Sequence, residues 1–321
     1  MIKRPTVIVL GAGSSAPFGF PVGARLRNLI LQQTPRDLDE IPNSPNSATV
    51  TRGSGEVFLK EFRRSNFGSI DAFLSRRPEF TSIGKHAIAR VLLPYESEAQ
   101  VLDSHPDDNW HRPLLDAMDA PWDSLHENAV AFITFNYDRS LEFALIGTLS
   151  ARFGRPLAEA RHLVGKLKIV HVYGSLGSLE PGRTDHVPFG GGATPAPYLF
   201  QAAAGIKVVP EGRDDSPEVQ RAQSWLTAAE ALCFLGFGFD PTNLRRLGGP
   251  SVIGAGGRAS GGSTRGLLFA ATAVSLTPQE VTDAIGAIAQ GPFHHSVRSG
   301  MLNMGCLDLI RSTNVIRAAE D

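Results

Sequence analysis

Near its start the chain reads Thr6-Val7-Ile8-Val9-Leu10-Gly11-Ala12-Gly13-Ser14-Ser15-Ala16. The first five residues are mostly β-branched and too few for a helix, so they predict a buried strand. Gly11 and Gly13 predict a tight turn in which a ligand can approach the main chain, because glycine has no side chain. Ser14 and Ser15 are suited to cap a helix that begins just beyond this turn.

A strand, a glycine turn and a helix start together predict an anion site, because free N–H groups and the helix dipole both favour phosphate. We therefore expect a dinucleotide pyrophosphate at Gly11, Ala12, Gly13, Ser14 and Ser15. Asp37 has about the spacing of the acidic residue that binds a ribose in dehydrogenases, but no strand precedes it. An ordinary dehydrogenase half-domain is thus disfavoured, and a turn without a ligand remains the alternative.

The composition predicts a globular protein with a sizeable core, since 42% of the 321 residues are hydrophobic and 20% are charged. The net charge of −1 gives no general attraction to nucleic acid, so we predict no direct nucleic-acid binding. Cys233 and Cys306 cannot form a four-cysteine zinc site or a disulfide framework, so we expect no zinc and a cytoplasmic location. No apolar run approaches the roughly 18 residues of a membrane span, so we expect no membrane insertion.

Strand-like runs alternate with helical segments along most of the chain, at 129–135, 168–173, 206–209, 231–235 and 266–271. This alternation predicts an α/β fold with a Rossmann-like parallel sheet that helices cover on both faces.

Two stretches, 34–51 and 248–262, have loop-like compositions, whereas 56–93 has a helical period. We predict a helical insertion subdomain at 34–125 and a nucleotide-binding domain formed by 1–33 and 126–321.

Polar residues and glycines follow three of these strands, where open α/β sheets bind ligands. They are Asn136 and Asp138 after the second strand, His171 and Gly174 at the third, and Gly236, Phe237, Gly238 and Asn243 after a later one. Each has an alternative role. Asn136 and Asp138 could cap the next helix, His171 could be a core histidine, and Gly236 and Gly238 could only form a turn.

These motifs, in this order, resemble the sirtuin-like fold, and more narrowly the bacterial sirtuin-like proteins of anti-phage defence systems. The resemblance covers about 6 to 275, and Ser69-Ile70-Asp71-Ala72-Phe73-Leu74 also resembles a segment of that branch, although Asp71 could be a solvated helix residue or an N-cap. It implies that the glycine loop holds the pyrophosphate and ribose of NAD, and that the turn at Gly236 lies beside the adenosine. It also implies that Asn136 and Asp138 lie by the nicotinamide ribose and that His171 is the catalytic base.

Two departures from sirtuins disfavour protein deacylation: the four zinc-binding cysteines are absent, and Phe20-Pro21-Val22-Gly23-Ala24-Arg25 replaces a Pro-Asp-Phe-Arg stretch. Neither departure argues against NAD cleavage. Its transition state is oxocarbenium-like, and a histidine with a pKa near 6.5 can accept a proton from water at neutral pH.

The resemblance therefore implies an NAD+ glycohydrolase that forms nicotinamide and ADP-ribose as the toxic effector of an anti-phage system. It also implies a homo-oligomer or a partner ATPase of HerA type. The alternative is a non-catalytic module that binds NAD or ADP-ribose and reports it to a partner, and less favoured is a deacylase or ADP-ribosyltransferase.

Overall fold

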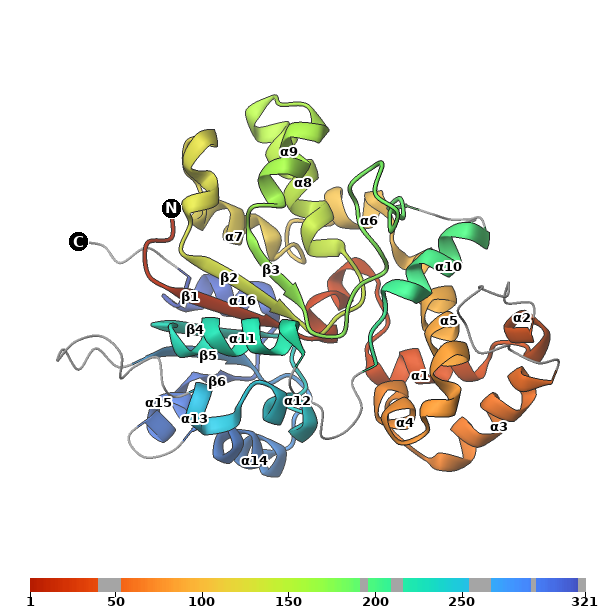
Figure 1. Ribbon diagram of the computed structural model, residues 1–321. Helices are drawn as coiled ribbons and strands as arrows, with labels where there is room; N and C mark the ends of the chain where they lie inside the picture. The colour runs from red at the N-terminus through yellow and green to blue at the C-terminus, as the bar shows by residue number, and fades with distance from the viewer. Residues whose placement is uncertain (40–52, 191–195, 209–215, 254–266, 290–292, 317–321) are drawn as a thin grey trace.

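The computed structural model describes residues 1–39, 53–190, 196–208, 216–253, 267–289 and 293–316 (Figure 1). Its strands form one six-stranded parallel sheet in the order β3-β2-β1-β4-β5-β6. They are β1 Thr6–Leu10, β2 Val130–Thr134, β3 Lys168–His171, β4 Ala231–Leu235, β5 Leu268–Thr272 and β6 Met301–Leu302. The predicted α/β class with a Rossmann-like parallel sheet is confirmed.

The first strand lies in the middle of this sheet. Ile8 of β1 is in register with Phe132 of β2 on one edge and with Cys233 of β4 on the other. All residues of β1 are buried, because neighbouring strands pair with both edges and helices cover both faces. This environment explains why the opening strand is a continuous apolar run rather than an alternating one.

Helices cover the two faces of the sheet and form two cores with it. Ile8 and Leu10 pack in a core with α7 His111–Ala117, α8 Ser140–Phe153, α9 Leu157–Val164 and α16 Cys306–Ser312. Val7 and Val9 point into the other core, with α11 Pro217–Thr227, α13 Gly249–Ile253, α14 Pro278–Ile288 and α15 Phe293–Gly300. Figure 1 shows α8 and α9 on the opposite side of the sheet from α14.

The second core extends into a group of helices beside the sheet, which we call the helical lobe (Figure 1, right). It consists of α1 Gly23–Leu31, α2 Pro35–Asp39, α3 Ser54–Ser65, α4 Ile70–Arg76, α5 Thr81–Leu92 and α10 Ala196–Gly205. Within it, the rings of Phe62 and Phe80 lie 5.0 and 5.6 Å from that of Phe73. The predicted helical period over 56–93 is thus confirmed as α3, α4 and α5.

The subdomain boundaries at 33/34 and 125/126 remain a prediction. Two lobe helices, α1 and α10, come from outside 34–125 and pack against α5, whereas α6 Glu98–Leu102 and α7 lie inside that range and pack against α8. The remaining helices are α12 Pro241–Arg246 and the 3₁₀ helices η1 Ala12–Ser14, η2 Ala16–Phe18, η3 Pro78–Phe80, η4 Leu93–Tyr95 and η5 Trp122–Glu127. Within the described ranges, no helix is long and apolar enough to cross a bilayer.

The segment after β1 differs from the prediction, because no α-helix begins at Ser14 or Ser15. Two 3₁₀ helices, η1 and η2, follow the turn, and α1 begins only at Gly23. The C-cap of η2 is Gly19, whose φ of +86° does not occur within a right-handed helix, so the chain cannot continue from Ser15 as an α-helix. The dipole of an α-helix, which we expected to favour phosphate here, is therefore absent from this turn.

Other differences are smaller. The expected strand at 206–209 is reduced to one antiparallel bridge between Ile206 and Gly174, and residues beyond 208 lie outside the described part. β6 was not predicted, because two residues carry no periodicity. The predicted loops contain the short helices α2 and α13, and their remaining residues 40–51 and 254–262 lie outside the described ranges.

Candidate functional site

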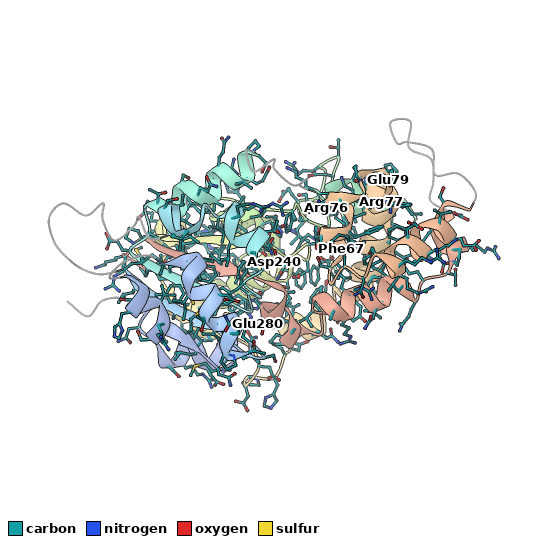
Figure 2. The ribbon with its side chains drawn as sticks, turned by 90° about the horizontal axis from the view of Figure 1, so that it is seen from below. Phe67, Arg76, Arg77, Glu79, Asp240 and Glu280 are labelled. Carbon is teal, nitrogen blue, oxygen red and sulfur yellow. The ribbon has the colours of Figure 1, made fainter. Side chains whose placement is uncertain are left out.

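A cleft of about 690 Å³ lies at the carboxyl ends of the strands, between the sheet and the helical lobe. Its sheet side is lined by turns after five strands, including Gly11, Asn136, Tyr173, Gly236 and Val274. Its lobe side is lined by residues of α1 and of the start of α4. In Figure 2, Asp240 lies on the side of the sheet part that faces the lobe, where Phe67 and Arg76 are labelled. This is the place where ligands bind in open α/β sheets.

The turn after β1 packs directly on the turn after β4. The N–H of Gly13 donates to the carbonyl of Gly236 at 2.9 Å, and the N–H of Gly11 donates to that of Leu235 at 3.0 Å. The N–H of Gly236 donates to Oγ1 of Thr272 at 2.8 Å. A Cβ on Gly13 would lie 2.8 Å from the Cα of Gly236, so this contact requires glycine on both sides. The two turns form one rigid floor for the cleft.

Asn136 joins the second strand to this floor. Its amide nitrogen donates to the carbonyl of Gly11 at 3.0 Å and lies 3.2 and 3.0 Å from the hydroxyl oxygens of Ser14 and Ser15. The N–H of Asn136 donates to Oγ1 of Thr134 at 3.0 Å. These bonds fix the amide plane of a buried side chain that lines the cleft, and they leave its Oδ1 as the atom outside this network.

Asp138 lies below the cleft and does not line it. Its Oδ1 accepts bonds from Oγ of Ser15 at 3.1 Å, and from Oγ and N–H of Ser140 at 2.5 and 3.1 Å. Burial raises the pKa of Asp138, although the bonds from Ser140 and Ser15 act in the opposite direction. Asp138 therefore connects the β1 turn to the first residue of α8. This role resembles the alternative in which Asp138 caps the next helix.

His171 opens into a second cavity, of about 680 Å³, which is lined by residues of α8, α9 and β3 and of the segment 175–185. Its Nδ1 donates to the carbonyl of Asn136 at 2.9 Å, and its Nε2 donates to Oε1 of Glu142 at 2.6 Å. Both ring nitrogens face acceptors, as expected of an imidazolium. Burial lowers the pKa of His171, but the Glu142 carboxylate and its hydrogen bond outweigh this effect, so the pKa lies above 6.5. In this arrangement His171 holds the Asn136 main chain, and its role as a base remains a prediction.

The His171–Glu142 pair gives a pH-dependent prediction. The raised pKa of His171 stabilises the fold fully below pH 6.5, and that stabilisation is lost as pH rises through the folded-state pKa. The pKa of Glu142 is lowered: burial raises it, but the charge and hydrogen bond of His171 outweigh burial, so its stabilisation is present above about pH 4.5. Glu142→Gln should therefore lower the free energy of unfolding by about 2 kcal/mol near pH 6, and by less near pH 9.

Urea unfolding at the two pH values measures this difference. Glu218→Gln is the matched control, because Glu218 pairs at 2.7 Å with a lysine, Lys207, and not with a histidine. Equal losses at both pH values in Glu142→Gln would contradict a charged pair.

Three cleft residues outside the predicted site form a polar cluster. They are Asp71 from α4, Tyr173 after β3 and Arg246 from α12. The hydroxyl of Tyr173 accepts a hydrogen bond from the Arg246 guanidinium and donates to Oδ1 of Asn243. The sequence could have indicated Tyr173 as a site residue, because it lies only two residues beyond His171. The apolar run predicts a strand to residue 173, but β3 ends at His171 and a turn from His171 to Gly174 redirects the chain.

The structure brings most of the other predicted residues together. Those that line the cleft are Gly11, Ala12, Gly13, Gly236, Phe237, Gly238 and Asn243. Ser14 and Ser15 are buried beneath it, and Gly174, with a φ of +68°, turns the chain after β3 against Gly205.

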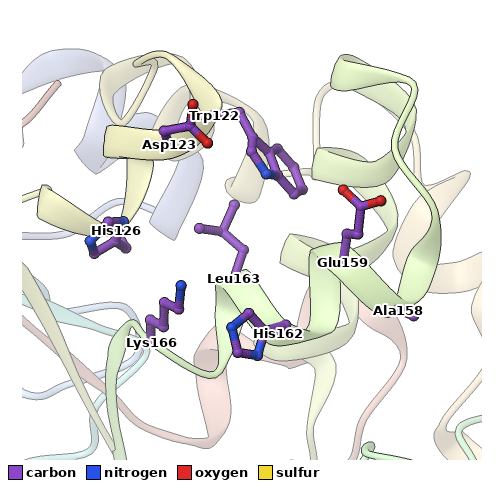
Figure 3. A pocket seen from close by; sticks show the side chains of 8 residues that line it. All are labelled: Trp122, Asp123, His126, Ala158, Glu159, His162, Leu163 and Lys166. Atoms are coloured by element: carbon purple, nitrogen blue, oxygen red, sulfur yellow. The ribbon is translucent and has the colours of Figure 1, made fainter.

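A third cavity, of about 400 Å³, lies between η5 and α9 (Figure 3). Figure 3 shows Trp122, His126, His162 and Lys166 around it, and none of these belongs to the predicted site. Across the ranges that the structure describes, no group of three or more His, Cys, Asp or Glu side chains could hold a metal ion.

No protein-family model matches the chain, and no curated protein matches it in sequence.

Proposed function

We propose that this protein binds NAD in the cleft and hydrolyses it to nicotinamide and ADP-ribose. The supporting observation is that one cavity joins the main chain of the Gly11–Gly13 turn to the Asn136 amide at the carboxyl edge of a parallel sheet. The cavity volume of about 690 Å³ is in the range of cofactor sites. The N–H groups of Gly11 and Gly13 already donate to Leu235 and Gly236, so the turn would offer a pyrophosphate the N–H of Ala12, which lines the cleft and makes no main-chain hydrogen bond among the described residues.

The chemistry of the cleft suits cleavage of the nicotinamide–ribose bond. The leaving nicotinamide is neutral and the transition state is oxocarbenium-like, so the site must hold the ribose, stabilise positive charge and admit water. Oδ1 of Asn136 is a fixed acceptor for a ribose hydroxyl or for that water. Asp71 and Asp240 bring carboxylates to the cleft, which favour the positive charge that develops.

The biological setting follows from the resemblance to sirtuin-like defence proteins. In this proposal the enzyme acts in the cytoplasm as the toxic effector of an anti-phage system. A homo-oligomer or a HerA-type ATPase restrains it until infection, and the reaction uses no zinc.

A second candidate is a non-catalytic module that binds NAD or ADP-ribose and reports it to a partner. One observation favours it: His171, the expected base, donates from both nitrogens and lines another cavity. The two candidates share the ligand and differ in whether it is consumed.

Incubation of the purified chain with NAD tests both. Release of nicotinamide and ADP-ribose, followed by chromatography, is the expected result. Calorimetric titration with ADP-ribose is run in parallel. Binding without release would support the sensor, and neither binding nor release would contradict the dinucleotide site.

A further inference from the structure

Asp71 brings a carboxylate from the helical lobe into the cleft. The N-cap of α4 is Ser69, whose hydroxyl accepts from the N–H of Ala72 at 3.2 Å, so Asp71 is not the capping residue. It stands in the first turn of α4 and lines the cleft together with Ser69 and Ala72. The opposite wall carries Asn136 and Tyr173. The carboxylate therefore shares the cleft with Asn136, which the proposed reaction uses.

The surrounding side chains fix the direction of this carboxylate. The hydroxyl of Tyr137, the residue after Asn136, donates to Oδ1 of Asp71. Within the described residues, Oδ2 of Asp71 accepts no hydrogen bond from a side chain. The Arg246 guanidinium is close enough to act on the charge of Asp71, and it is itself bonded to Tyr173. The Tyr137 hydroxyl and the main-chain N–H of Asp71 thus orient the carboxylate, which still lines the cleft.

The other titratable candidates are engaged differently. Oδ1 of Asp240 accepts the N–H groups of Thr242 and Asn243 at 2.9 and 3.2 Å, as the N-cap of α12. Asp138 lies beneath the cleft, and His171 lines the second cavity with both nitrogens donating. Among the described cleft residues, Asp71 is therefore the carboxylate best placed to take a proton.

We propose that Asp71 is the catalytic base of the NAD hydrolysis proposed above, on which this inference rests. Water attacks C1′ of the nicotinamide ribose and forms the new C–O bond. The bond between C1′ and the pyridine nitrogen breaks, and its electron pair leaves with neutral nicotinamide. The proton of the water passes to the Asp71 carboxylate and then to solvent. The same negative charge stabilises the oxocarbenium-like state.

The electrostatics of the cleft agree with this role. Burial raises the pKa of Asp71, while the hydrogen bond from Tyr137 and the charge of Arg246 act against burial without cancelling it. The charged or titratable groups that act on it are Tyr137, Tyr173, Arg246 and Asp240. A base must be ionised, so kcat should fall on the acid side of the raised pKa.

The test measures kcat and ADP-ribose affinity in Asp71→Asn. We expect kcat to fall about 100-fold or more, with ADP-ribose affinity within about threefold of the parent. Added sodium azide should restore nicotinamide release in Asp71→Asn and yield an ADP-ribosyl azide, because azide attacks C1′ without a proton to remove. Asp37→Asn is the matched control, since Asp37 is a lobe carboxylate whose partner Arg90 lies on α5, outside the cleft.

Tyr137→Phe distinguishes the loss of the proposed base from the loss of the hydrogen bond that orients it. It removes the bond to Oδ1 but keeps the carboxylate, so we expect a loss in kcat of less than about tenfold and an acid limb shifted to higher pH. Equal losses in Tyr137→Phe and Asp71→Asn without azide rescue would assign Asp71 to lobe packing and overturn the proposal. So would an unchanged kcat in Asp71→Asn. An inactive parent protein is a different result: it refutes the proposed hydrolase, and this inference with it.

Discussion

Gly236→Ala should lower the free energy of unfolding by about 3 kcal/mol or more, the largest stability loss that we expect from one methyl group. Gly236 has a φ of +59°, a conformation that costs about 1 kcal/mol or more for other residues. The added Cβ would also lie 2.0 Å from the N of Ser14 and 2.2 Å from the C of Gly13. Both are main-chain atoms of the β1 turn, so neither can rotate away.

Urea unfolding measures this loss, with Gly238→Ala as the matched control. Gly238 lies two residues further along the same turn, its φ is not positive and a Cβ there would meet no atom within 4 Å. We expect the control to change the free energy of unfolding by less than about 1 kcal/mol. Comparable stabilities of the two variants would contradict close packing between the β1 and β4 turns.

The structure gives Gly11 and Gly13 a different role from the one that the sequence suggested. We expected Gly13 to leave room for a phosphate, but a side chain there meets the main chain of Gly236 at 2.8–2.9 Å. Gly13→Val is therefore expected to disturb the fold as well as the ligand. The sequence predicts a glycine turn from local angles, but it cannot show that a second glycine turn, more than 200 residues later, packs against it.

Strand ends were predictable to within a residue or two, and this accuracy was sufficient for Asn136 but not for His171. Asn136 follows a run whose end is marked by the change from apolar to polar residues. The run at His171 continues through Val172 and Tyr173 without such a change, so the sequence predicts a strand that extends to residue 173. The turn closed by the N–H of Gly174 on the carbonyl of His171 at 3.2 Å instead separates the side chains of His171 and Tyr173 into two cavities.

Buried pairs of residues that are distant in the chain could not be predicted from the sequence, for a different reason. Arg139 is almost fully buried and its guanidinium pairs with the equally buried Glu96, while its Nη1 donates to the carbonyl of Val187 at 2.5 Å. A buried charge is tolerable only when it is paired and hydrogen-bonded, yet nothing local marks these partners. The same holds for Asp71 and Arg246, which the fold brings to one cleft from two helices that are distant in the chain.

Asn136→Ala should lower NAD turnover about 100-fold or more while the protein remains folded, the largest loss of activity that we expect outside Asp71. The amide nitrogen holds the carbonyl of Gly11 at 3.0 Å, so its loss also loosens the turn that we propose to receive the pyrophosphate. Its stability cost should be about 1–3 kcal/mol, because buried acceptors lose their donor.

Asn136→Asp tests the same amide with almost unchanged shape. A carboxylate oxygen would replace the nitrogen 3.0 Å from the carbonyl of Gly11, so two acceptors would face each other. Nicotinamide release should therefore fall in Asn136→Asp as it does in Asn136→Ala, whereas Asn303→Ala, at an exposed position, should match the parent protein. Turnover near the parental rate in both Asn136 variants would mean that this amide only braces the turn, and that the ribose and the attacking water are held elsewhere in the cleft.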